Sequence, residues 1–411
     1  MKPSDRRAPR EKMANAIALT RREVSARLAP LLPRPLQDRF VPAQYRWSRA
    51  DLKPVAKAGT GDVRLLIAPA NFASQAVFWA RAAELLPGVF ARSLAFGHAP
   101  SGMAARPDVS VDQRVGRSSH IWARRQRKQI LRDFTHVLYE AERPILGGLY
   151  GGDLEAEIRD LQTHGVRVGF ISHGSDIRTP SVHVDLEPYS PFNSPLDGLT
   201  DALEEGSVKN RGLLERVGLP TFVSTPDLLQ YTPDAQWLPT LTDPKPWESL
   251  SPSRLGERKP VVLHVPSKSA LKGTALIREQ MQLLDDEGVI EYREASNVPY
   301  GDMPALVESA DVVIDQVSMG LYGVASVEAL LAGRIVVAQV GDYIRDHIRR
   351  ETGLEVPIVE VNPKTIGRVV RDIANNPKDY LSRVDDGRSF AHAVHSADRA
   401  ARVLEPFLLR G

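Results

Sequence analysis

The chain has 411 residues, and because a typical domain holds roughly 150 residues, this length favours two domains with an appendage. Apolar residues make up 42% and charged residues 25%, which is typical of a globular protein and argues against a disordered, collagen-like or coiled-coil chain. The sequence contains no cysteine, which excludes disulfides, thiolate metal ligands and cysteine nucleophiles. No apolar run is long enough for a membrane-spanning helix, and the first residues do not resemble a signal peptide, so we expect a cytoplasmic protein.

Positive charge is concentrated at the N-terminus. Residues 1–60 hold 14 Lys and Arg against five Asp and Glu, whereas the whole chain has a formal net charge of only +2. Apolar residues recur at helical spacing from Met13 to Leu31, which predicts a basic amphipathic helix over 11–31. Such a helix could rest on an anionic membrane, or pack on its own domain with a solvated basic face. Nucleic-acid-binding proteins are more often basic over a whole domain and rich in aromatics, so no nucleic-acid partner is expected.

Residues 61–236 alternate short aliphatic runs with helix-length amphipathic segments. The runs predict strands at 63–68, 89–96, 135–140, 166–172 and 220–224. After the turn 69–74 a helix is expected to end at Leu86, and a later one to span Asp153 to Thr163. This alternation predicts a parallel sheet covered by helices on both faces.

A second basic segment lies inside this domain, at residues 114–132. Its basic residues, which surround Trp122, are Arg114, Arg117, Arg124, Arg125, Arg127, Lys128 and Arg132. They could bind anionic lipid headgroups or a lipid-diphosphate acceptor, or they could form solvated helix faces. Together with residues 1–35, this segment makes peripheral attachment to the inner face of the cell membrane a further expectation.

A proline-rich segment without periodicity, residues 237–260, predicts a linker. The alternation then restarts, with strands expected at 261–265, 289–293, 311–315 and 335–339 and helices at 273–287, 302–309 and 324–332. A second α/β domain is therefore expected over 261–392, followed by an amphipathic helix over 393–411. Ligands bind beyond the carboxyl ends of parallel strands, so two such domains would face each other across a central cleft.

The loops of this second domain carry the sharper chemical signals. The loop after strand 261–265 contains Ser267, Lys268, Lys272 and Thr274 just before a helix. Free amides at a helix N-terminus, two lysines and two hydroxyls make a good anion site, although a surface loop with incidental lysines would look the same. Glu328 lies in the helix that follows the loop Gly320-Leu-Tyr-Gly323, where it could bind ribose hydroxyls or compensate the helix dipole.

The ordered series of motifs resembles a known family. The segments are His264-Val-Pro-Ser-Lys-Ser-Ala-Leu-Lys272-Gly-Thr, Val298-Pro, Ala310-Asp-Val-Val-Ile-Asp-Gln316, Gly320-Leu-Tyr-Gly323 and Glu328-Ala-Leu-Leu-Ala-Gly. They are similar to the donor domain of family 4-type retaining glycosyltransferases with the GT-B fold. The resemblance implies an α/β fold of two Rossmann-like domains facing a cleft and a C-terminal helix that returns to the first domain. The basic helix predicted over 11–31 would be an N-terminal extension of this fold.

The resemblance also implies roles for single residues. Lys272 matches the lysine that holds the nucleotide diphosphate and stabilises the leaving group, and Glu328 matches the second glutamate of a Glu-x7-Glu motif, which binds ribose. Gly320 stands where the first glutamate touches the donor sugar, and Ser267 stands in place of a phosphate-binding arginine, whose charge Lys268 could supply. The remaining donor-binding residues that we expect are Asn71, Ser74, Thr274, Val298, Gln316, Tyr322 and Gly323.

In the first domain, strand 166–172 ends in His173-Gly-Ser-Asp176-Ile-Arg178. The resemblance implies that His173 lies near the transferred sugar as a catalytic residue, while Asp176 and Arg178 could shape the acceptor pocket. A turn that closes the strand is the structural alternative for these residues. Histidines are scattered, and no metal-binding motif occurs, so neither a metal nor another cofactor is expected.

The sequence thus predicts a glycosyltransferase that moves a sugar from a nucleotide diphosphate sugar to a glycan or lipid-linked acceptor, with retention, in polysaccharide or glycoconjugate biosynthesis. A nucleotide-sugar epimerase on the same fold is one alternative, and it would need a cluster of acids and histidines in the cleft. A non-catalytic nucleotide- or glycan-binding module is the other alternative.

Overall fold

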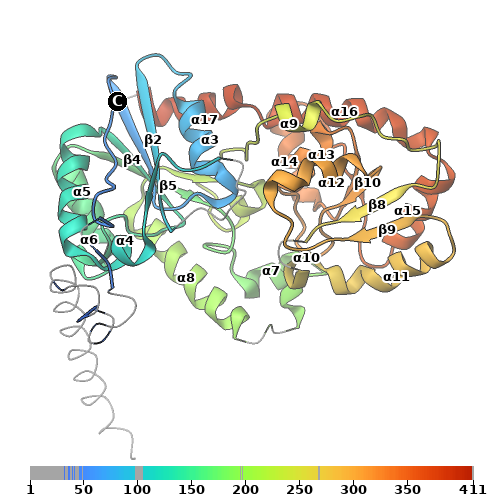
Figure 1. Ribbon diagram of the computed structural model, residues 1–411, viewed down its shortest axis with the longest axis horizontal. Helices are drawn as coiled ribbons and strands as arrows, with labels where there is room; N and C mark the ends of the chain where they lie inside the picture. The colour runs from blue at the N-terminus through green and yellow to red at the C-terminus, as the bar shows by residue number, and fades with distance from the viewer. Residues whose placement is uncertain are drawn as a thin grey trace, which may run out of the picture.

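The molecule consists of two α/β lobes that lie side by side, with the last helices running along both of them (Figure 1). The structure is a computed structural model that describes residues 50–97, 105–194, 196, 198–266 and 269–409, together with residues 32, 36, 37, 39, 41 and 46–48. The predicted helix over 11–31 lies outside these residues, as do Ser267 and Lys268. No helix in the described part of the chain is long and apolar enough to cross a membrane.

The first lobe is built on a parallel sheet. Its strands are β1 (Val63–Ala68), β2 (Val89–Phe96), β3 (Val109–Val111), β4 (His136–Glu140), β5 (Arg167–Ser172), β6 (Thr221–Val223) and β7 (Gln236–Trp237). Within the described residues these seven strands lie in the order β3-β2-β1-β4-β5-β6-β7, and every neighbouring pair is parallel. The helices of this lobe are α3 (Gln75–Ala83), α4 (Gln113–Ser118), α5 (His120–Asp133), α6 (Leu154–Thr163), α7 (Pro180–Leu186) and α8 (Leu199–Val217).

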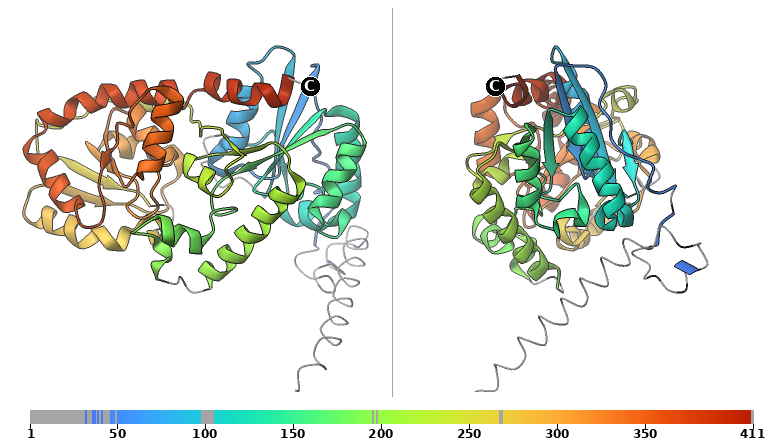
Figure 2. Two further views of the ribbon diagram at one scale, coloured as in Figure 1. Left: turned by 180° about the vertical axis from the view of Figure 1, so that it is seen from behind. Right: turned by 90° about the vertical axis from the view of Figure 1, so that its left-hand side faces the viewer.

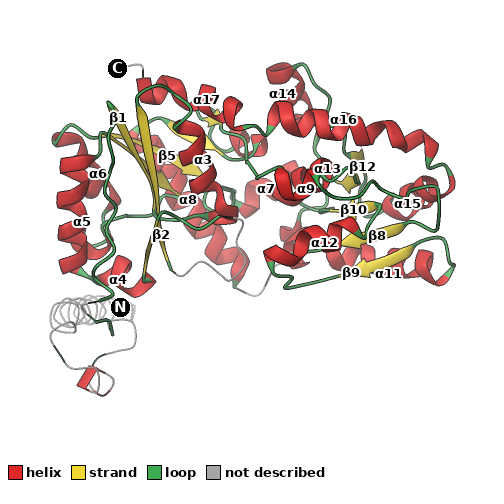
Figure 3. Cartoon of the chain, turned by 45° about the horizontal axis from the view of Figure 1, so that its top comes forward, coloured by secondary structure: helices red, strands yellow, loops and turns green. Residues whose placement is uncertain are grey.

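The second lobe repeats this plan after a linker that contains the short helix α9 (Lys245–Glu248). Its strands are β8 (Val261–His264), β9 (Glu291–Glu294), β10 (Val312–Ile314), β11 (Ile335–Ala338) and β12 (Val359–Glu360). In the described chain these five strands form a parallel sheet in the order β12-β11-β10-β8-β9. The helices are α10 (Ser269–Lys272), α11 (Thr274–Asp286), α12 (Met303–Glu308), α13 (Val324–Leu331), α14 (Asp342–Thr352), α15 (Ile366–Asn375) and α16 (Lys378–Val394). Figure 3 shows helices on both faces of each sheet.

The strands predicted from aliphatic runs are confirmed, and the one displaced prediction has a physical reason. The apolar pair Val289-Ile290 suggested a strand over 289–293, but β9 spans Glu291–Glu294. Ile290 is fully buried in the turn before the strand, whereas β9 lies at the sheet edge and carries polar residues. The short edge strands β3, β7 and β12 were not predicted, because two or three residues at the edge of a sheet do not form a buried aliphatic run of their own.

The two faces of the first sheet are covered by different parts of the chain. Leu65 and Ile67 point to one face, where they join a core cluster with Trp79 of α3. Leu66 points to the opposite face and packs in the cluster that contains Trp122 of α5. This is the alternation expected of a strand that is buried on both sides.

The C-terminus returns to the first lobe as one helix within residues 393–411, as predicted, and a separate helix of the second lobe precedes it. Helix α16 packs on α13 and β11 of the second lobe, and after a break at His395-Ser396 helix α17 (Ala397–Leu409) packs against α3 of the first lobe. Figure 2 shows this crossing from behind. Phe407 of α17 makes edge-to-face contacts with His136 and Phe222, at centroid distances of 5.3 and 6.0 Å. Helix α17 therefore completes the core of the first lobe.

Replacing Phe407 with alanine tests this role of α17. We expect Phe407→Ala to destabilise the first lobe by about 3–5 kcal/mol, because it removes a buried aromatic side chain and leaves a cavity. Leu409→Ala, at an exposed position of the same helix, is the matched control. Urea unfolding followed by tryptophan fluorescence measures both variants, and equal midpoints for the two would contradict the assigned role.

Candidate functional site

The two lobes meet where the loops at the carboxyl ends of their strands touch. The contacting residues of the first lobe lie in α7 and just after it, and α7 follows β5. The loop that they contact in the second lobe follows β10. His183 Nε2 lies 3.3 Å from the carbonyl oxygen of Met319, and Gln339 Nε2 donates a hydrogen bond of 2.8 Å to Glu187 Oε2. We call this region the interdomain junction, and it lies at the sheet edges where parallel α/β folds bind ligands.

A buried ion pair organises the second-lobe side of the junction. Lys272 Nζ lies 2.5 Å from Asp315 Oδ1, and the other carboxylate oxygen accepts hydrogen bonds from the Gly323 amide and the Ser326 hydroxyl. Burial acts to raise the pKa of Asp315, but the charge and hydrogen bond of Lys272 outweigh burial and keep this pKa below its usual value. Lys272 keeps part of its side chain exposed and has N–H donors beyond the one aimed at Asp315.

Glu328 lies at the same edge, but its carboxylate is buried. Its Oε1 accepts hydrogen bonds from the Tyr300 hydroxyl at 2.9 Å and from the hydroxyl of Thr242, in the linker, at 3.2 Å. Burial raises the pKa of Glu328 to about 7, although both hydroxyls act to lower it. This carboxylate can therefore change its charge near neutral pH.

Three helices of the second lobe begin at this edge with glycine at the N-cap position. The residues before the first turns of α11, α13 and α14 are Gly273, Gly323 and Gly341, which have no side chain that could cap the helix, and at α13 the Gly323 amide donates a hydrogen bond to Asp315. By contrast, α5 and α6 in the first lobe are capped by Ser119 and Asp153. Uncapped amides at a helix N-terminus carry partial positive charge and can bind an anion.

Gly320 leaves room for a carboxylate from the other lobe. Its φ is 67°, a left-handed conformation that favours glycine, and a Cβ added there would lie 2.0 Å from Glu187 Oε1. The carboxylate of Glu187, which follows α7, thus fills the space that a side chain at position 320 would need. Burial raises the pKa of Glu187, and the hydrogen bond from Gln339 opposes this rise.

His173 follows β5 on the first-lobe side. Its Nε2 lies 3.1 Å from Oε1 of Glu140, the last residue of β4, and its ring packs against Phe72 and Trp79. Glu140 is fully buried, and its other oxygen accepts a hydrogen bond from the Ala70 amide. Burial raises the pKa of Glu140, while the contact with His173 acts to lower it. The glutamate therefore fixes the orientation of the imidazole.

A second buried carboxylate lies beside this pair. Glu142 accepts a hydrogen bond from the Ser172 hydroxyl at 2.7 Å, and its Oε2 is buried with no hydrogen-bond partner among the described residues. Burial raises the pKa of Glu142 well above its usual range, so the acid is expected to be neutral. Ala141 and Glu142 both have positive φ, 54° and 51°. Such strain in non-glycine residues is concentrated at functional sites.

Several residues predicted to bind the donor instead build the loops. Asn71 and Ser74 both bond to the backbone of Ala105, Thr274 bonds to the buried His264, and the amide group of Gln316 bonds to the backbone of its own loop and of Gln339. Val298 is half-buried in the loop after β9. The side chains of Asn71, Ser74, Thr274 and Gln316 thus hold the loops in position.

Three of the predicted site residues have partners within the protein. Tyr322 is buried, and its hydroxyl lies 3.0 Å from His395 Nε2 at the start of the return to the first lobe. Arg178 is buried in an ion pair with Asp227, at 2.5 Å. Asp176 accepts hydrogen bonds from the amides of His173 and Gly174, which is the turn-closing alternative.

The structure also brings in residues that the sequence did not single out. Glu140 and Glu142 could have been noticed as acids at the end of a predicted strand, and Asp315 as the last residue of another. No local pattern marks Glu187, because its partners come from the other lobe. Within the described residues, no group of three or more histidine, aspartate or glutamate side chains is arranged to hold a metal ion.

Comparison with known proteins adds the fold class. No protein-family model matches the chain, and no curated protein sequence matches it. Among solved structures, the chain is similar to sucrose-phosphate synthase from Thermosynechococcus elongatus, with a TM-score of 0.52 and 13% identity over 84% of this chain and 97% of that one. It is also similar to WaaG, a glycosyltransferase involved in lipopolysaccharide biosynthesis, with a TM-score of 0.49 and 14% identity over 85% of this chain and 100% of that one. A third similar structure is Anabaena HepE in complex with UDP and glucose, with a TM-score of 0.48 and 12% identity over 85% of this chain and 99% of that one. The chain therefore has the predicted GT-B fold.

Substitution of Gly320 tests the contact between the lobes. We expect Gly320→Ala to lower stability by about 1–3 kcal/mol, because the new Cβ collides with Glu187 and the backbone conformation disfavours alanine. At Gly323, whose φ is −116°, an added Cβ would lie 3.8 Å from its nearest neighbour, so Gly323→Ala is the control.

Thermal unfolding of the full chain measures both variants. In a Glu187→Ala background the cost of Gly320→Ala should shrink, since the colliding carboxylate is gone and only the backbone strain remains. If Gly320→Ala costs no more than Gly323→Ala, or if removing Glu187 gives no relief, the described contact is wrong.

Proposed function

We propose that this chain is a glycosyltransferase that binds a nucleotide diphosphate sugar at the interdomain junction and transfers the sugar to an acceptor hydroxyl. The fold supports the proposal because it is shared with a sucrose-phosphate synthase. Fold alone does not define a reaction, so the argument depends on the chemistry at the junction.

The observation that carries the proposal is the anion site around Lys272. Lys272 precedes Gly273, the glycine before α11, and α13 begins at the same sheet edge after another glycine, Gly323. A cation held by Asp315 and free helix amides suit the diphosphate of a nucleotide. When the bond from the sugar C1 to the diphosphate oxygen breaks, its electron pair goes to that oxygen, and Lys272 and the amides stabilise the new charge.

Glu328 and Glu187 supply the other polar groups of this site. Glu328 would exchange its bonds with Tyr300 and Thr242 for bonds from ribose hydroxyls, and its raised pKa makes that exchange depend on pH. Glu187 places a carboxylate beside Gly320, where the family that the sequence resembles has a glutamate that touches the donor sugar. We infer that Glu187 takes over this contact from the opposite lobe.

His173 acts from the first lobe. In the tautomer that donates from Nε2 to Glu140, Nδ1 is free to accept a hydrogen bond from a sugar hydroxyl. We propose transfer with retention, in which the acceptor oxygen attacks C1 on the face that the diphosphate leaves and gives its proton to the departing phosphate oxygen. Neither a protein nucleophile nor a metal takes part in this scheme, and the proposed acceptor is a glycan or a lipid-linked acceptor.

One observation favours a second candidate function. Glu140, Glu142, His173 and Asp176 lie together after β4 and β5, and such a cluster of acids with a histidine is what an epimerase on this fold would need. An epimerase changes the nucleotide sugar without any acceptor, whereas a transferase needs an acceptor or water. A non-catalytic module would bind the nucleotide and leave the nucleotide sugar intact.

Thermal-shift titration with UDP, GDP, ADP and TDP, with and without EDTA, tests the donor site. A ligand that binds only the folded state raises the melting temperature, so we expect one nucleotide to stabilise the chain, with EDTA having no effect. The stabilisation should grow between about pH 6 and about pH 8 as Glu328 ionises through its pKa of about 7, and this growth should be absent in Glu328→Gln.

The raised pKa of Glu328 also makes the stability of the protein without ligand depend on pH. Because the pKa of Glu328 is raised on folding, its contribution to stability is fully present below about pH 4.5 and is lost as pH rises to about 7. Wild type should therefore lose stability relative to Glu328→Gln over this range. If no nucleotide stabilises the chain at any pH, the donor-site assignment is wrong.

The chain is then incubated with sugar derivatives of the nucleotide that stabilises it, and chromatography of the products distinguishes the three candidate functions. Release of the nucleoside diphosphate that is stimulated by an acceptor sugar supports the transferase. Conversion to an isomeric nucleotide sugar without acceptor supports the epimerase, and binding with no conversion in either assay supports the module.

A further inference from the structure

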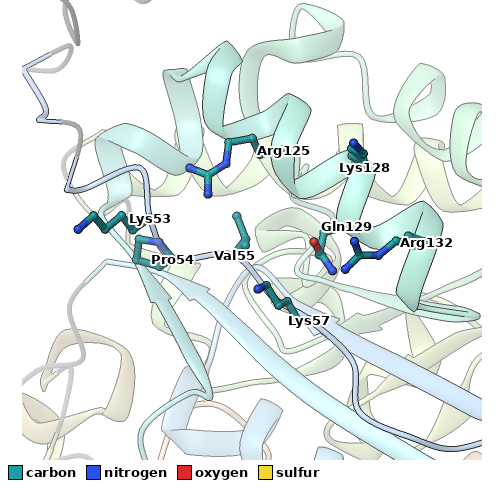
Figure 4. Close-up of a pocket in the computed structure, with 8 residues that line it drawn as sticks. All are labelled: Lys53, Pro54, Val55, Lys57, Arg125, Lys128, Gln129 and Arg132. Atoms are coloured by element: carbon teal, nitrogen blue, oxygen red, sulfur yellow. The ribbon is translucent and has the colours of Figure 1, made fainter.

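A basic pocket lies on the first lobe, between an extended segment that precedes β1 and helix α5. It encloses about 590 Å³. Its lining residues are Lys53, Pro54, Val55, Lys57, Arg125, Lys128, Gln129 and Arg132. Figure 4 shows the basic side chains on the two sides of the pocket, with Lys53 and Lys57 from the extended segment and the other three from the helix.

The two walls of this pocket are tied together. The carbonyl oxygens of Leu52 and Pro54 accept hydrogen bonds from Arg125 and from the indole of Trp122, at 2.7 and 2.6 Å. The Ala56 amide donates a hydrogen bond of 2.8 Å to Gln126, and both residues are fully buried. The segment is therefore fixed against α5, and the pocket exists before any ligand arrives.

The three lysines of the pocket are not neutralised by neighbouring acids among the described residues. In the part of the chain that the structure describes, Lys53, Lys57 and Lys128 have no ion-pair partner, and Arg132 pairs only with the adjacent Asp133. On another side of α5, Arg127 is paired with Asp160 at 2.5 Å. The arginine that α5 pairs with an acid of another helix thus points away from the pocket, and positive charge is concentrated in the pocket.

The pocket is separate from the interdomain junction. Helix α5 ends at Asp133 and β4 begins at His136, so the last turns of α5 lie beside the amino ends of the strands. The Asp133 carbonyl oxygen accepts a hydrogen bond from Arg64, near the start of β1, which confirms this placement. His173 and the rest of the junction lie at the carboxyl ends. A ligand in the pocket cannot be the nucleotide that the junction binds.

We propose that the basic pocket binds the phosphate groups of an anionic ligand outside the interdomain junction. Arginine and lysine are the side chains that recognise phosphate, through forked and single charge-assisted hydrogen bonds. Arg125 and Arg132 are seven residues apart, so helical rise separates them by about 10 Å along α5, which suits more than one phosphate. The lining contains no aromatic side chain on which a nucleic-acid base could stack.

Two sources could supply these phosphates, namely the headgroups of an anionic lipid surface and a soluble phosphorylated compound. The probes that separate them are inorganic pyrophosphate, measured by calorimetry, and vesicles of phosphatidylglycerol with phosphatidylcholine, measured by co-sedimentation. The pocket variant is Lys57→Glu with Lys128→Glu. The control is Lys209→Glu with Lys378→Glu, which gives the same change in net charge at exposed positions outside the pocket.

We expect wild type and control to bind a probe and the pocket variant to bind it about tenfold more weakly or not at all, since two charged contacts are lost. Pocket-dependent binding to vesicles identifies lipid headgroups as the source, and pocket-dependent binding of pyrophosphate alone identifies a soluble phosphorylated ligand. The pocket variant leaves the junction unchanged, so pyrophosphate should still bind there. Binding at the pocket is therefore measured as the decrease in the number of pyrophosphate molecules bound per chain. If the pocket variant keeps the affinity and stoichiometry of the control for both probes, or if wild type binds neither, the proposal is wrong.

Discussion

The buried carboxylate of Asp315 fixes the second-lobe side of the junction. It follows the central strand β10 and joins the segment before α11, through Lys272, to the start of α13, through Gly323 and Ser326. A buried carboxylate without a cation would be costly, and a lysine that is exposed would be loosely placed. Asp315 therefore positions one cation and two helix N-termini through its contacts with Lys272, Gly323 and Ser326. Because the loop over 316–321 lies between these anchored points, the contact surface for the first lobe depends on the same pair.

The first lobe meets this surface with its own acidic groups. Glu187 occupies the space left by Gly320, and Glu140 holds His173 from behind. Each lobe thus supplies what the other lacks, since the second lobe has the cation and helix amides and the first lobe has the histidine and a carboxylate. Such a division gives a reason for the two lobes to act as one site. The basic pocket lies at the opposite edge of the first sheet and leaves this arrangement untouched.

Periodicity and composition could predict the architecture because the strands are buried on both faces and stand out as aliphatic runs, as Val63–Ala68 and Val261–His264 do. Edge elements such as β9 and the two-residue strands lack that signal. For the site, spacing could mark Lys272 and Glu328 but could not show what their side chains contact. Spacing also marked Tyr322 and Arg178, but it could not show that they are buried against His395 and Asp227. The Glu187 contact depends on residues more than a hundred positions away, so no local pattern could have shown it.

Hydrogen–deuterium exchange, with and without the nucleoside diphosphate that stabilises the chain most, tests the central claim that both lobes form one nucleotide-sugar site. Ligand binding suppresses local opening of the segments that it contacts. The account predicts slower amide exchange in residues 269–276 and 316–327 of the second lobe, together with residues 173–187 of the first. Protection limited to segments outside the junction, or no protection at all, would contradict it.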